Sequence, residues 1–129
     1  MGLAKPAMTW SNNMYNYSLL TEDQLEYIEI AAASVLANGE RLFIEIDDLS
    51  IVIFNIAGEI FAIADICSHD NGPLGEGELD GTDIVCPRHG ARFDVRTGKV
   101  TMMPAVVDIP AYPVRVRDGT IEIGLPKQS

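Results

Sequence analysis

Residues 114–123 read VRVRDGTIEI, in which branched apolar residues alternate with charged ones on both sides of an Asp-Gly pair. An alternation with a period of two places the valines on one face of a strand and the arginines on the other. Asp118-Gly119 is a favoured two-residue hairpin turn because both positions tolerate a positive φ. This segment therefore predicts an antiparallel β-hairpin.

The same β character extends upstream of the hairpin. Short runs rich in Ile, Val, Phe and Tyr recur at close spacing, and turn signals such as Asp47-Asp48 and Ala57-Gly58 separate them. The runs cover residues 27–31, 42–46, 51–56, 60–64 and 84–86. We therefore expect an all-β domain of eight to ten short strands, arranged as a sandwich or a barrel.

Two segments interrupt this pattern. Residues 65–83 contain four glycines and one proline, which argue against any regular element there, and residues 87–91 form a second loop. A long loop inside a compact domain is usually either functional or disordered. We expect the two loops to lie close together and to carry the functional residues.

Residues 1–24 differ from the rest of the chain, since they are polar and aromatic without a period. We interpret them as an N-terminal extension that is partly ordered at most, with a docking segment as the alternative. Within it, residues 21–24 fit a helix capping box and predict one short helical turn. The folded domain is then expected to span residues 25–129.

Charge is distributed unevenly along the 129 residues, whose net charge is −10. Residues 1–83 hold fifteen acids against two bases, whereas residues 84–129 hold four acids against seven bases. An acidic chain repels phosphate backbones, which argues against nucleic acid as a partner. The acidic half predicts either a solubilising surface or steering toward a basic protein partner.

Membrane and export signals are missing from the sequence. It contains no run of about 18 apolar residues that would span a bilayer, and its first residues lack the apolar core of a secretory signal. We therefore expect a cytoplasmic protein without a membrane partner.

Only two cysteines and two histidines occur in the chain, and they form two pairs. Cys67-Ser68-His69 lies in the first loop and Cys86-Pro87-Arg88-His89 in the second, with sixteen residues between His69 and Cys86. In a reducing cytoplasm, two cysteines accompanied by two histidines indicate metal more often than a disulfide. Cys67, His69, Cys86 and His89 are therefore candidate metal ligands.

The order of these residues bears on which metal they hold. A single zinc ion is one alternative, because two thiolates and two imidazoles make a good tetrahedral set. A zinc finger usually has both cysteines in one knuckle and both histidines in the other, whereas here they alternate. Alternation suits two ions side by side, each loop reaching one ion with Cys and the other with His. A Cys–His nucleophile pair is a further alternative, but it would not need two copies.

The pattern C-x-H, sixteen residues, then C-P-x-H-G resembles the Rieske iron–sulfur motif, and the resemblance extends over about residues 25–125. It implies a Rieske-like antiparallel β sandwich or barrel with a cluster-binding subdomain of two loops, at about residues 65–94. It also implies one [2Fe–2S] cluster. By this resemblance Cys67 and Cys86 bind the inner iron, while His69 and His89 bind the outer iron through Nδ1.

Four positions depart from the Rieske proteins of respiratory cytochrome complexes. Gly72 and Arg88 stand where that type carries two further cysteines in a disulfide. Ala91 and Phe93 stand where it has a Ser and a Tyr whose hydroxyls bond to cluster sulfurs. Because hydrogen bonds to the sulfurs raise the reduction potential, the resemblance implies a potential near the low end of the Rieske range, about −150 mV.

The resemblance thus implies a soluble Rieske ferredoxin rather than an enzyme with its own substrate site. Such a protein carries one electron from an NAD(P)H-dependent reductase to a terminal non-haem iron oxygenase of the ring-hydroxylating type, with the histidines as exit points. The small Rieske subunit of an NAD(P)H nitrite reductase is one alternative, and an electron donor working beside iron–sulfur assembly or another oxidoreductase is another. A zinc-stabilised interaction module is the alternative of a different class.

Two further features surround the motif. Five charged residues predict either a docking rim or solvated loop charges: Asp65, Asp70, Glu76, Arg88 and Arg92. Residues 102–105, Met-Met-Pro-Ala, resemble the proline loop that shields the cluster in the Rieske family. Ordinary core packing of the two methionines is the alternative.

Overall fold

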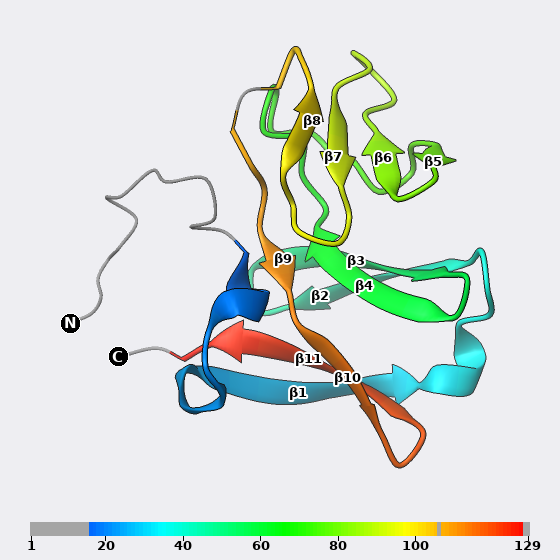
Figure 1. Ribbon diagram of the computed structural model, residues 1–129, viewed down its shortest axis with the longest axis vertical. Helices are drawn as coiled ribbons and strands as arrows, with labels where there is room; N and C mark the ends of the chain where they lie inside the picture. Colours follow the sequence, from blue (N-terminus) through cyan, green and yellow to red (C-terminus); the bar gives the residue numbers. More distant parts are fainter. Residues whose placement is uncertain (1–15, 106, 128–129) are drawn as a thin grey trace.

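Eleven strands make up three antiparallel sheets in the computed structural model, which describes residues 16–105 and 107–127 (Figure 1). The strand orders are β1-β11-β10, β2-β3-β4-β9 and β5-β6-β7-β8. The strands are Leu25–Ala32 (β1), Arg41–Ile46 (β2), Leu49–Ile56 (β3), Glu59–Ala64 (β4), Leu79–Asp80 (β5), Asp83–Val85 (β6), Arg92–Asp94 (β7), Val100–Met102 (β8), Ala111–Tyr112 (β9), Val114–Arg117 (β10) and Thr120–Pro126 (β11). The predicted all-β antiparallel fold is confirmed.

The sheet β2-β3-β4-β9 lies between the other two sheets (Figure 1), and its strand β3 is buried on both faces. Ile51 and Ile53 of β3 pack in the core shared with β11, whereas Val52 and Phe54 pack in the core shared with β6 and β7. All four side chains are fully buried. A strand covered on both faces needs apolar residues at every position, which explains the unbroken run at residues 51–54.

Tight turns join the longer strands where the sequence predicts them. Asp118 and Gly119 have φ values of 53° and 77°, and Arg117 pairs with Thr120 across the turn. Ala57 and Asp47, at the other two predicted turns, also have positive φ. The polar and small residues at these turns therefore set the register of the hairpins.

Two charged residues of the β10–β11 hairpin, Arg115 and Glu122, are covered rather than fully solvated, whereas Arg117 is exposed. Glu122 is only 6% exposed, and its carboxylate accepts a hydrogen bond of 2.5 Å from Nε of Arg115. The Arg115 guanidinium in turn stacks over the ring of Tyr27 on β1, 3.8 Å from its centroid. Burial of a carboxylate is tolerated here because it is paired and hydrogen-bonded.

Strand β5 corrects the prediction that residues 65–83 contain no regular element. Leu79 pairs with Ile84 and Asp80 with Asp83, so a short hairpin closes around Gly81, whose φ is 64°. The glycine that argued against a strand is thus the turn of a hairpin. The count of strands in the described residues exceeds the predicted eight to ten because β5 and β9 have only two residues each.

Part of the N-terminal extension lies against the sheets. Two 3₁₀ turns span Tyr17–Leu19 (η2) and Glu22–Gln24 (η3), and the predicted capping box of Thr21 and Gln24 is present. The ring of Tyr17 lies 5.4 Å from that of Tyr112 on β9. Residues 1–15 lie outside the described residues, and the boundary at residue 25 stays a prediction.

A third 3₁₀ turn, Ala33–Val35 (η4), connects β1 to the loop before β2. Across residues 16–105 and 107–127, no helix is long and apolar enough to cross a bilayer.

Candidate metal centre

Two loops at the end of the β5–β8 sheet bring the four candidate ligands together. The long loop, residues 65–78, connects β4 to β5 and carries Cys67 and His69. The short loop, residues 86–91, connects β6 to β7 and carries Cys86 and His89. The strands that flank the short loop are neighbours in the sheet, so its two ends are held side by side.

Both loops use the same backbone hydrogen bonds around their cysteine. The N–H of Cys67 donates to the carbonyl of Gly72, and the N–H of Asn71 donates back to the carbonyl of Cys67. In the short loop, the N–H of Cys86 donates to Ala91 and that of Gly90 donates to Cys86. The fourth residue after each cysteine has a positive φ, 61° at Asn71 and 79° at Gly90. The two loops are therefore equivalent turns facing one another.

The thiols lie at the bottom of this arrangement. Cys67 is 0% and Cys86 2% exposed, both belong to the core beneath the loops, and neither forms a disulfide. Burial raises the pKa of Cys67, whose thiol is hydrogen-bonded to Cys86. Burial also opposes ionisation of Cys86, but hydrogen bonds from the backbone N–H groups of Arg88 and His89 outweigh it and lower the pKa of Cys86. Both sulfurs thus have backbone donors ready for thiolates.

The imidazoles lie at the surface above the thiols. The rings of His69 and His89 are 4.8 Å apart, at an interplanar angle of 81°, and both residues are exposed. Nδ1 of His89 lies 3.5 Å from a carboxylate oxygen of Asp70. The four candidate ligands therefore differ in burial: the two soft sulfurs are buried, and the two imidazole rings face outward. In the described residues no three Cys, His, Asp or Glu side chains converge on one ion position.

Charged residues around the ligands are engaged within the protein. The carboxylate of Asp65 accepts hydrogen bonds from the N–H groups of Leu74 and Gly75, at 2.8 and 2.6 Å. Arg92 pairs with Asp80 at 2.7 Å, and Arg88 pairs with Asp70. Of the five residues considered for a docking rim, Asp65, Asp70 and Arg88 hold the loops, Arg92 pairs within the β5–β8 sheet, and Glu76 is exposed.

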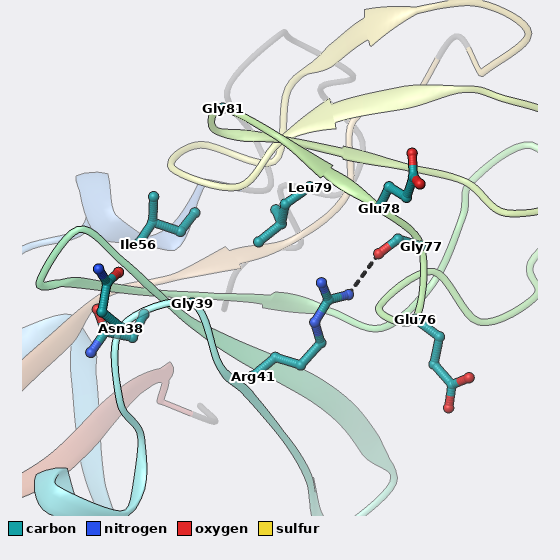
Figure 2. A pocket seen from close by; sticks show the side chains of 10 residues that line it. Asn38, Gly39, Arg41, Ile56, Glu76, Gly77, Glu78, Leu79 and Gly81 are labelled. Atoms are coloured by element: carbon teal, nitrogen blue, oxygen red, sulfur yellow. Dashed lines mark hydrogen bonds between the residues drawn. The ribbon is translucent and has the colours of Figure 1, made fainter.

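Arg41 is a site residue that the sequence analysis missed. From β2 it reaches the long loop, where Nη1 donates to the carbonyl of Gly75. The same nitrogen donates to the carbonyl of Gly77 at 2.7 Å (Figure 2). Its guanidinium lies 5.3 Å from the ring centroid of Phe54 and lines a shallow pocket between β2 and residues 76–81. The sequence feature that could have pointed to Arg41 is its isolation, since no other Lys or Arg lies between Lys5 and Arg88.

The remaining residues of the motif region divide into buried and exposed ones. Ala91 and Phe93 are both fully buried in the core that contains the cysteines, and neither carries a hydroxyl. Met102 and Met103 are 51% and 73% exposed, so the core-packing interpretation of the methionines is wrong. Beyond them, Val107 accepts a hydrogen bond of 2.5 Å from the hydroxyl of Ser68.

Comparison with known proteins agrees with this geometry. A family model described as the Rieske [2Fe-2S] domain matches residues 26–113. The chain is 33% identical over 101 residues to the ferredoxin component of the naphthalene 1,2-dioxygenase system of Pseudomonas putida, covering 78% of this chain and 97% of that protein. It is 43% identical over 90 residues to the 3-phenylpropionate/cinnamic acid dioxygenase ferredoxin subunit of Escherichia coli K12, covering 69% and 84%.

A solved structure extends the comparison to three dimensions. One chain of the solved complex of reduced oxygenase and oxidised ferredoxin in carbazole 1,9a-dioxygenase superposes on this chain with a TM-score of 0.72 at 28% identity. The match covers 80% of this chain and 96% of that one. Buried thiols, outward imidazoles and the matched family together identify the present chain as a member of the Rieske [2Fe-2S] domain family that binds a Rieske-type cluster.

Proposed function

We propose that this protein is the ferredoxin component of a multicomponent dioxygenase system. It takes one electron from an NAD(P)H-dependent reductase and passes it to a terminal non-haem iron oxygenase of the ring-hydroxylating type. The observation that carries the proposal is the position of His69 and His89, exposed at the tip of a domain whose thiols are buried beneath them. Relatives matched over 97% and 84% of their own lengths are named as ferredoxin components of dioxygenase systems.

We assign the inner iron to Cys67 and Cys86 and the outer iron to His69 and His89. The depth of the donors supports this assignment, since both sulfurs lie in the core and both rings lie at the surface. When bound, the cluster takes up and releases one electron. The backbone N–H groups that point at the sulfurs stabilise negative charge there, and the exposed rings shorten the path to a docked partner.

A low reduction potential within the Rieske range follows from the residues near the sulfurs. Ala91 and Phe93 are fully buried and supply no hydroxyl to the cluster. Without those hydrogen bonds, the more negative reduced state is stabilised less, so we expect a potential of about −150 mV. We place the protein in the cytoplasm, where a reducing environment keeps Cys67 and Cys86 available as thiolate ligands.

Two other functions were open on sequence grounds. The names of the relatives favour a dioxygenase system over a nitrite reductase. A zinc module is disfavoured because the matched family binds a [2Fe–2S] cluster and because the sulfur donors are buried whereas the nitrogen donors are exposed. The protein is proposed to be an electron carrier without a substrate site of its own, as its relatives' names describe.

Reconstitution tests the proposal. The purified holoprotein should contain two irons and two sulfides per chain and restore NADH-driven turnover to a mixture of reductase and terminal oxygenase from the host. The same mixture without the protein is the control. A colourless protein with stoichiometric zinc, or a coloured protein that transfers no electron to any oxygenase while reducing a nitrite reductase, would contradict the assignment.

A further inference from the structure

One guanidinium bridges the two ligand loops. Arg88, on the short loop, donates from Nε and Nη2 to the two carboxylate oxygens of Asp70 on the long loop, at 2.6 and 2.9 Å. Its third nitrogen, Nη1, donates to the carbonyl of Pro73 at 2.7 Å. All three nitrogens of one side chain therefore contact the opposite loop.

The long loop is shaped to receive this guanidinium. Asp70 also accepts the N–H of Gly72 at 3.0 Å, which orients its carboxylate. A Cβ on Gly72 would lie 2.7 Å from Nη2 and 2.8 Å from Cζ of Arg88. The φ of Gly72 is not in the left-handed region, so the backbone does not require glycine there. Glycine at position 72 instead leaves the space that the guanidinium fills.

The bridge lies directly beside both imidazoles. Asp70 follows His69 in the chain, Arg88 precedes His89, and Asp70 approaches Nδ1 of His89 to 3.5 Å. Backbone hydrogen bonds close each loop on itself around its cysteine. The described side-chain contacts thus make Arg88 a link between the two halves of the site.

We propose that Arg88 and Asp70, with the space left by Gly72, form a brace that holds His69 and His89 at the separation the cluster requires. The inference rests on the ligand assignment made above. Arg88 and Asp70 are positioning residues, since they act through the neighbouring histidines. An ordinary exposed ion pair contributes little, but a bidentate pair with a third hydrogen bond fixes orientation as well as distance.

Arg92 offers a matched control for the brace. It carries the same charge, follows the short loop by one residue, and pairs with Asp80 within the β5–β8 sheet rather than with the long loop. Replacing Arg88 or Arg92 with Gln removes the same charge from the same subdomain. Only R88Q disconnects the two loops.

The test measures how fast the holoprotein loses its visible absorbance to a chelator, together with the EPR line widths of the reduced cluster. We expect R88Q to lose the cluster about tenfold faster than wild type with broadened lines, as for other residues that orient metal ligands. R92Q should stay within about twofold of wild type, because it breaks no contact between the loops.

Gly72→Ala tests the same contact without changing any charge. It should accelerate cluster loss in the wild-type background and have no further effect in R88Q, because the guanidinium that it displaces is then absent. Equal behaviour of R88Q and R92Q, or additive effects of G72A and R88Q, would overturn the brace. If R88Q does not fold, G72A alone decides: faster cluster loss supports the brace, and an unchanged rate of cluster loss contradicts it. A wild-type protein without a cluster would instead refute the proposed function.

Discussion

The long and short loops share one hydrogen-bonded turn around their cysteines, yet they are held in different ways. The short loop joins neighbouring strands β6 and β7, so the ladder of the sheet sets its geometry. The long loop has no such frame, and charged side chains hold it: Asp65 binds its N–H groups and Arg41 its carbonyls. The two halves of one site can therefore have the same backbone conformation while different parts of the sequence stabilise them.

Loss of the thiol from either loop should have the same effect, namely loss of the cluster, although the two loops are held in different ways. Cys67→Ser and Cys86→Ser each remove one buried sulfur donor, and a serine hydroxyl is a poor iron ligand at neutral pH. We expect both variants to lack visible absorbance and EPR signal after purification. Ser68→Ala, beside Cys67, is the control and should retain the cluster. A coloured C67S or C86S protein would argue against the ligand assignment.

Arg41→Gln should affect the long loop selectively. Removing hydrogen bonds from a charged donor to two carbonyls is expected to lower the free energy of unfolding by about 1–2 kcal/mol and to accelerate cluster loss about fivefold. Chemical denaturation and chelator challenge measure the two effects. Arg117→Gln removes an exposed arginine of β10, outside the long loop, and is the control. If R41Q and R117Q behave alike, the long loop does not depend on Arg41.

Several of these features follow from the sequence and others do not. The turns at Asp118-Gly119 and Ala57-Gly58 are local, so their residues predict them. The four ligand positions are likewise predicted, because the motif is short and all Cys and His of the chain belong to it. Local patterns carry this information without knowledge of the packing.

Long-range contacts account for what the sequence did not predict. Arg41 reaches Gly77, 36 residues away; its isolation from other basic residues marks it as unusual but does not indicate this partner. The burial of Glu122 depends on Tyr27 and Arg115 meeting from separate strands. The apolar run of β3 is consistent with burial on both faces, but it does not say which elements cover each face; only the packing of the three sheets decides that.

A hydroxyl introduced at the end of the short loop should raise the reduction potential of the cluster. Ala91→Ser adds a hydroxyl next to the cysteine turn at little cost in volume. A hydrogen bond to a cluster sulfur that strengthens by about 1 kcal/mol on reduction corresponds to about 40 mV for one electron. Redox titration should therefore show a midpoint about 40 mV higher. Ala111→Ser, in the same core but on β9, should leave the midpoint unchanged. An unchanged midpoint in A91S would remove hydroxyl loss as the reason for a low potential.

The smallest expected effect is a pH dependence at the turn that follows the short loop. Burial opposes ionisation of Asp94, but hydrogen bonds from the side chain and backbone of Arg96 outweigh it and lower the pKa of Asp94. Because the folded pKa lies below the unfolded value of about 3.9, the carboxylate stabilises the fold above that pH. Its contribution is lost as the pH falls through the folded value.

Asp94→Asn should therefore lower the melting temperature at pH 7 by about 3 °C, and the gap to wild type should close at more acidic pH. Asp118→Asn, at an exposed hairpin turn that accepts either residue, is the control. A gap that persists unchanged into strong acid would mean that the charge of Asp94 is not what stabilises the turn.

Pulsed EPR tests directly whether both histidines bind the cluster. The holoprotein can be labelled with ¹⁵N in its two histidines alone, reduced, and examined by pulsed EPR. We expect hyperfine coupling from two histidine nitrogens to the reduced cluster, because His69 and His89 are both assigned to the outer iron. Coupling from one nitrogen or from none would contradict it.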